Sequence, residues 1–137
     1  MKSRTQKTVK YSLMAVLSVV LISSIILMLN PLRWPEKMLR QQLLRQTPVG
    51  TDIDEVIQYL ESQDEWEIIY VNHTAGYHYF DGRPYEAGVG AEIGEQSIRV
   101  YLGEYRNPLA VDVNVFYAFD GDGKLMDAAI MKSIDSI

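Results

Sequence analysis

The first apolar pattern along the chain is an uninterrupted run from Tyr11 to Leu29. These 19 residues include no charged side chain, and as a helix they span nearly 30 Å at about 1.5 Å per residue. The run ends at Asn30-Pro31, without the small-residue cleavage site that follows the shorter apolar core of a signal peptide. The pattern therefore predicts an uncleaved transmembrane anchor over 11–29, with a cleaved signal peptide as the alternative.

A second apolar pattern predicts a juxtamembrane helix within 30–46. Pro35 suits the first turn of a helix, and Leu39 and Leu43 are four residues apart, which gives the helix one apolar edge. The basic side chains of this region favour either a solvated face or a face near anionic headgroups. These residues are Arg33, Lys37 and Arg40.

A third pattern predicts the most regular helix of the chain, which begins after Pro48-Val49-Gly50. Thr51 has the character of an N-cap, with Asp54 at the capping-box position. Apolar residues then recur at the spacing of one helix face. They are Ile53, Val56, Ile57 and Leu60.

The remaining apolar pattern is mostly alternating, which is typical of strands in an antiparallel sheet. The expected strands are 66–71, 97–105, 111–119 and 124–134, with a turn at Asp120-Gly121-Asp122-Gly123. We expect an α+β fold, in which two helices cover one face of an antiparallel sheet of three to five strands.

The segment from Asn72 to Gln96 is too long for a simple connection in a small domain. It holds five glycines and an aromatic cluster before Asp81-Gly82, so it forms either a loop or a hairpin. Exposed aromatic residues are favoured interface anchors, and we expect the segment to bind a partner. The expected contacts are Tyr77, Tyr79, Phe80 and Tyr85, with Asp81 and Glu86 at the rim. In the alternative, the aromatic residues pack on the sheet and close its open face.

Charge is unevenly distributed along the chain and bears on its placement. Residues 1–10 hold four basic side chains, whereas the chain from Gln46 onward holds 5 basic and 17 acidic ones, a net charge of −12. That sign excludes nucleic acid as a partner of the domain. Because a short basic tail is costly to translocate, we expect the N-terminus in the cytoplasm. The expected organisation is a cytoplasmic tail (1–10), an anchor in the inner membrane (11–29), a juxtamembrane helix (30–46) and an extracytoplasmic domain (47–137).

Catalytic chemistry finds no support in the residue pattern. The absence of cysteine excludes disulfides, thiolate metal sites and a cysteine nucleophile. His73 and His78 are the only histidines, and their spacing matches no established zinc pattern. The glycines of 88–94 lack the spacing of a nucleotide loop, and a calcium loop from Asp120 would end at Met131. We therefore expect no catalytic, cofactor-binding or metal-binding residue.

Two segments resemble a known family. The segment Pro48 to Val56 resembles the helix entry of the SmpA/OmlA (BamE-like) family of small bacterial outer-membrane assembly lipoproteins. Val111 to Leu125 resembles the closing hairpin of that family, with its Phe-Asp-x-x-Gly-Lys turn. The resemblance implies an ααβββ sandwich and a role in envelope assembly or protein–protein contact.

Three functions follow as expectations, in decreasing order. The first is a non-enzymatic, membrane-anchored interaction module whose partner is another envelope protein. The second is an immunity protein, whose acidic domain neutralises a basic toxin outside the membrane. The third, ranked last, is a metal-binding protein or enzyme that uses His73 and His78.

Overall fold

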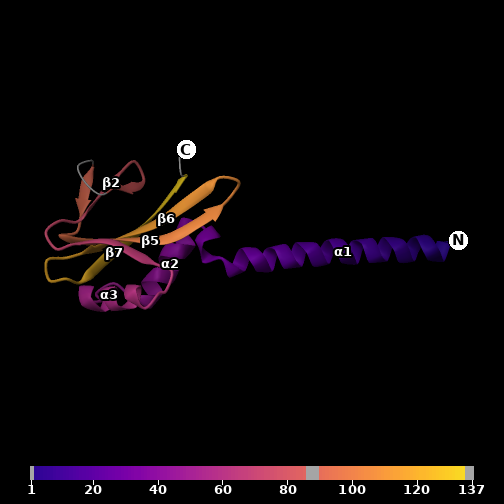
Figure 1. The fold of residues 1–137 in the computed structure, drawn as a ribbon, viewed down its shortest axis with the longest axis horizontal. Coiled ribbons are helices and arrows are strands. Elements are labelled where there is room, and N and C mark those ends of the chain that lie inside the picture. Colours follow the sequence, from indigo (N-terminus) through magenta and orange to yellow (C-terminus); the bar gives the residue numbers. More distant parts are fainter. Residues whose placement is uncertain (1, 86–89, 135–137) are drawn as a thin grey trace. The chain divides into compact units, whose positions relative to one another are not determined.

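The computed structural model describes residues 2–85 and 90–134. The chain divides into two units, the first within residues 1–34 and the second within residues 35–137. The first unit consists of the helix α1 (Lys2–Leu29) and the short 3-10 helix η1 (Pro31–Arg33) (Figure 1). Within α1, the 24 residues from Ser3 to Ile26 are long and apolar enough to cross a membrane, and none of the apolar window is buried. An anchor and a signal sequence share this property.

The second unit is an α+β domain with antiparallel sheets. Its described elements are α2 (Glu36–Gln46), α3 (Ile53–Glu61), β1 (Glu67–Asn72), β2 (Tyr77–Phe80), β3 (Arg83–Tyr85), β4 (Ala91–Ile93), β5 (Gln96–Arg106), β6 (Ala110–Phe119) and β7 (Leu125–Ile134). The larger sheet has four strands in the order β1-β5-β6-β7. The smaller sheet has the order β3-β2-β4 and is inserted in the sequence between β1 and β5.

One face of the larger sheet holds the main apolar core. The strand register pairs Ile98 with Tyr117 and Val100 with Val115, so all four side chains point to this face, where they are fully buried. Helices α2 and α3 lie on one side of the larger sheet and the small sheet lies on the other (Figure 1). The helices contribute five buried apolar residues. They are Leu39, Leu43, Ile53, Val56 and Leu60.

The opposite face of the larger sheet is partly covered as well, which differs from the single covered face expected from the sequence. Tyr77 of β2 packs with Phe116 and Ala118 of β6, and the Tyr77 and Phe116 rings meet edge to face with centroids 5.8 Å apart. Residues 113–119 are therefore buried on both faces of β6. The physical reason is that the aromatic segment within 72–96 supplies a second apolar layer.

The 72–96 segment contains the hairpin that the sequence left open, and β4 adds a third strand to it. Asp81 and Gly82 have φ angles of 49° and 76°, the left-handed conformations that a tight two-residue hairpin turn requires. The neighbouring Gly76 approaches the backbone of β4 so closely that a Cβ atom there would lie 2.0 Å from the Ile93 carbonyl oxygen. The path of the backbone at Gly76 therefore leaves no room for a side chain between β2 and β4.

Helix α3 begins one residue later than the sequence suggested. Asp52, not Thr51, is the N-cap, and its carboxylate accepts from the Asp54 N–H at 3.3 Å. The Thr51 hydroxyl instead donates to the Pro48 carbonyl at 2.6 Å. Ile57, expected in the core stripe, is only half-buried and lies at the margin of that stripe.

Candidate functional site

The aromatic residues expected to bind a partner divide between the two faces of the small sheet. Tyr77 and Tyr79 share the face of β2 that looks toward the larger sheet, whereas His78 and Phe80 share the other face. Tyr85 pairs with His78 in the register and lies on that outer face too. Tyr77 is only 2% exposed, so it packs on the sheet, as in the alternative interpretation. Tyr79, Phe80 and Tyr85 are 42%, 51% and 39% exposed.

The structure describes only one of the two residues expected at the rim of the binding surface. Asp81 is exposed at the tip of the β2–β3 turn. Glu86 lies outside the described residues.

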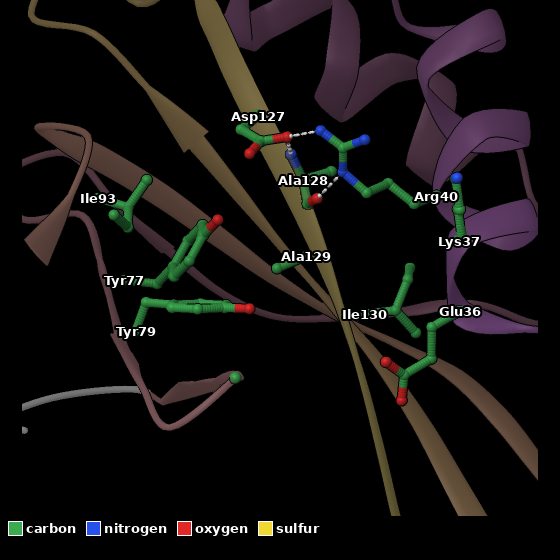
Figure 2. Close-up of a pocket in the computed structure, with 11 residues that line it drawn as sticks. Glu36, Lys37, Arg40, Tyr77, Tyr79, Ile93, Asp127, Ala128, Ala129 and Ile130 are labelled. Carbon is green, nitrogen blue, oxygen red and sulfur yellow. Dashed lines mark hydrogen bonds and ion pairs between the residues drawn. The ribbon is translucent and has the colours of Figure 1, made fainter. Parts of the chain in front are cut away.

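A pocket of about 380 Å³ opens beside the inner face of β2. It is bounded by the first turns of α2, by the middle of β7 and by the small sheet, as Figure 2 shows. Apolar and aromatic side chains line part of it, and four charged side chains lie around it. The lining residues are Glu36, Lys37, Arg40, Tyr77, Tyr79, Gly82, Ile93, Asp127, Ala128, Ala129 and Ile130.

The best-defined polar contact at the pocket joins α2 to β7. Arg40 forms an ion pair with Asp127, and its Nε donates to the Ala128 carbonyl at 2.9 Å. The Asp127 carboxylate also accepts from the Ala128 N–H at 2.8 Å. Both backbone groups of Ala128 are therefore satisfied by side chains. The two contacts made by Arg40 hold α2 along β7.

Tyr77 and Tyr79 provide the aromatic part of the pocket, and their rings lie one beside the other in Figure 2. Burial raises the pKa of Tyr77 well above its usual value, and the nearby Asp127 carboxylate raises it further, against the opposing effect of Arg40. Tyr77 therefore stays a neutral phenol at physiological pH. Its ring is mainly structural, whereas the half-exposed Tyr79 ring is accessible to a ligand.

Two opposite charges lie at the open side of the pocket, on the first turn of α2. Glu36 and Lys37 are both exposed, and neither side chain makes a hydrogen bond or an ion pair within the part of the chain that the structure describes. Together with the Arg40–Asp127 pair, they leave the pocket with no net formal charge. They are available to polar groups of a ligand that enters from this side.

The histidines do not form a metal site with their described neighbours. His73 Nδ1 lies 2.8 Å from the Gln96 side-chain oxygen, and His78 Nδ1 is buried with no partner among the described residues. In residues 2–85 and 90–134, no group of three or more histidine, aspartate or glutamate side chains is arranged to hold a metal ion.

The arrangement is that of a binding pocket with an apolar lining and a few placed polar groups. Sequence reasoning found Tyr77 and Tyr79 but missed Arg40, Asp127 and Ile130. One signal was available, because Asp127 interrupts an otherwise apolar stretch, residues 125–131, and a carboxylate there needs a partner. For Arg40 the sequence indicates only a solvated or headgroup-facing position, since nothing local links it to Asp127, 87 residues away.

No known protein family model matches this chain, and no curated protein or solved structure is detectably similar to it.

Proposed function

We propose that this protein is a single-pass, membrane-anchored, non-catalytic module that binds another envelope protein through the pocket between α2, β7 and β2. The observation that carries the proposal is the pocket itself. It has an accessible tyrosine, a pair of exposed opposite charges and, in its lining, the Arg40–Asp127 ion pair that joins α2 to β7. Mixed apolar and polar lining of this kind suits recognition.

The placement of the module follows from its N-terminus. Helix α1 serves as an uncleaved anchor in the inner membrane, and the basic residues of 1–10 stay in the cytoplasm. The domain is then extracytoplasmic, where its partner is an envelope protein. The sequence resemblance to the BamE-like family is what supports a role in envelope assembly or maintenance.

The test is site-specific photocrosslinking in intact membranes. A photoreactive phenylalanine analogue replaces Tyr79 in one protein and Phe80 in another. These adjacent residues are similarly exposed but lie on opposite faces of β2, so Phe80 is a matched control. We expect a defined protein adduct from position 79 only. Equal adducts from both positions, or none from position 79, would overturn the proposal.

A second candidate function rests on a different surface. Residues 52–67, which include α3, contain seven acidic side chains and no basic one. Such a surface suits an immunity protein that captures a basic toxin outside the membrane. A photoreactive residue at the exposed position Gln58 of α3 would then crosslink to the toxin, whereas position 79 would not.

A further inference from the structure

Strand β7 forms one edge of the larger sheet, so one side of its backbone has no neighbouring strand in that sheet. The chain satisfies part of this free side itself. The Leu125 N–H donates to the Thr51 carbonyl and the Leu125 carbonyl accepts from the Gly50 N–H, both at 2.8 Å. Further along, Arg40 and the Asp127 side chain satisfy the Ala128 backbone.

The next position of β7 whose backbone faces outward is Ile130, and there neither the chain before α3 nor the Arg40–Asp127 pair supplies a partner. Backbone groups of an edge strand point alternately toward and away from the neighbouring strand. Ala128 and Ile130, which face Tyr117 and Val115 of β6, are two residues apart in an unbroken stretch of register. The Ile130 N–H and C=O therefore point away from β6, in the plane of the sheet, as those of Ala128 do. Among the described residues, no loop backbone and no side chain bonds to the Ile130 N–H or C=O on this outer side of β7.

The pocket lies at this unprotected position. Ile130 lines it, and so does Gly82 of the β2–β3 turn. In Figure 2, Glu36 and Lys37 of α2 lie on one side of Ile130 and Tyr79 lies on the other. A helix and a hairpin thus flank an open strand edge. A backbone added beside β7 would lie about 4.8 Å from it, the normal spacing of paired strands.

We propose that an extended, cationic peptide segment of the partner pairs with β7 at Ile130 as an added strand and inserts one apolar side chain against Tyr79. This proposal rests on the proposed function and specifies how the same pocket is occupied. An extended peptide supplies the backbone acceptor and donor that Ile130 requires, and its alternating side chains reach the pocket.

The sign of the partner's charge follows from the domain as a whole. The four charged side chains of the pocket cancel, so they select neither sign. Residues 35–137 hold 8 basic and 18 acidic side chains, a net charge of −10. The field of such a domain attracts cationic segments and raises their association rate, most strongly at low salt.

The experiment titrates the full-length, nitrogen-15-labelled protein in lipid nanodiscs with a capped peptide of alternating lysine and valine around a central phenylalanine. We expect saturable shifts of the Ile130 amide and slower hydrogen exchange there. The same peptide, N-methylated at every second residue so that the edge facing β7 loses its donors, should bind at least tenfold more weakly. A glutamate-for-lysine peptide should also bind at least tenfold more weakly.

Two protein variants complete the test. Tyr79→Ala should weaken binding about tenfold, whereas Phe80→Ala on the outer face should leave it unchanged, with both spectra still those of a folded domain. Equal binding of the N-methylated and unmodified peptides would overturn strand addition. Strand addition by a partner peptide would also be overturned if the Ile130 amide shifted with protein concentration in the absence of peptide, because a second copy of the chain would then occupy the edge. If position 79 still crosslinks to a protein in membranes in either case, the proposed function stands and only strand addition fails.

Discussion

Arg40 of α2 and Asp127 of β7, 87 residues apart in the sequence, form an ion pair across the edge of the larger sheet. Each of them also bonds to the backbone of Ala128, so the pair replaces the neighbouring strand at that position. An edge strand with unpaired backbone groups is open to other chains. The pair satisfies the backbone of β7 at Ala128. It does not reach the next position whose backbone faces outward, Ile130, which lines the pocket.

The first prediction concerns this pair. Arg40→Ala should lower the free energy of unfolding by about 1 kcal/mol, because the Ala128 carbonyl loses its donor and the ion pair itself is partly exposed. Arg40→Lys keeps the charge but cannot make both contacts, so an intermediate value is expected. Chemical denaturation of the full-length protein in detergent measures the difference. Identical stability of the wild type and Arg40→Ala would show that the pair does not hold α2 on β7.

The second prediction concerns the buried hydroxyl of Tyr117. The Thr47 hydroxyl lies near this oxygen but donates to the Leu43 carbonyl, so the Tyr117 oxygen makes no hydrogen bond of normal geometry among the described residues. Burial raises the pKa of Tyr117 far above its ordinary value of 10.0, against a smaller opposing effect of Thr47. Removing an unpaired buried polar group costs nothing, so Tyr117→Phe should leave stability equal or slightly higher. Thermal denaturation at neutral pH measures this effect.

The same residue predicts a dependence on alkaline pH. With the folded pKa raised, the stability due to Tyr117 is fully present below pH 10 and is lost as the pH rises toward the folded pKa. The unfolded state releases the phenolic proton first, so each pH unit above 10 costs about 1.4 kcal/mol for this group. Tyr117→Phe should reduce the slope of stability against pH in that range. An unchanged slope would mean that Tyr117 ionises as easily in the folded domain as in the unfolded chain.

The third prediction compares two glycines of the small sheet. A Cβ atom at Gly82 meets nothing within 4 Å, but φ is 76°, so Gly82→Ala should cost about 1 kcal/mol through backbone strain alone. Gly76→Ala should be more harmful, because its Cβ would collide with the Ile93 carbonyl. The amide spectrum should then show displacement of β2 from β4. Equal effects of the two substitutions would contradict the close approach of Gly76.

The fourth prediction concerns the helical side of the core. Leu60→Ala should destabilise the domain by about 2–5 kcal/mol, because Leu60 is buried and its removal leaves a cavity. Gln58→Ala on the exposed face of the same helix should change stability by no more than about 0.5 kcal/mol. Similar losses for the two variants would mean that α3 presents a different face to the sheet.

The fifth prediction concerns the anchor. The mature protein should retain residues 1–30 and fractionate with the inner membrane, because no cleavage site follows Leu29. Mass spectrometry of the purified protein measures its N-terminus. A mature chain that begins after Asn30 would identify α1 as a cleaved signal. A reporter fused after Ile137 should be active only outside the cytoplasm.

The sequence alone was sufficient to predict those helices, strands and turns that depend on local information. The apolar helix, the stripe of α3, the alternation of β5 and β6 and the turn at Asp120 each depend on neighbouring residues, whose periodicity and turn chemistry are visible in the chain. The Asp120 carboxylate indeed accepts from the backbone N–H groups of Asp122 and Lys124. The N-cap of α3 was misplaced by one residue, because Thr51 and Asp52 are both good caps and their competing contacts decide between them.

Only the tertiary structure decided how distant segments meet. The pattern of 72–96 was compatible with a loop or a hairpin, and its packing against Phe116 converted an expected open sheet face into a second core. The pocket likewise depends on α2, β2 and β7 meeting at one edge, which strand order and the Arg40–Asp127 contact determine. Hydrophobic burial is non-directional. A sequence pattern therefore shows which side chains are buried, but not which surfaces they pack against.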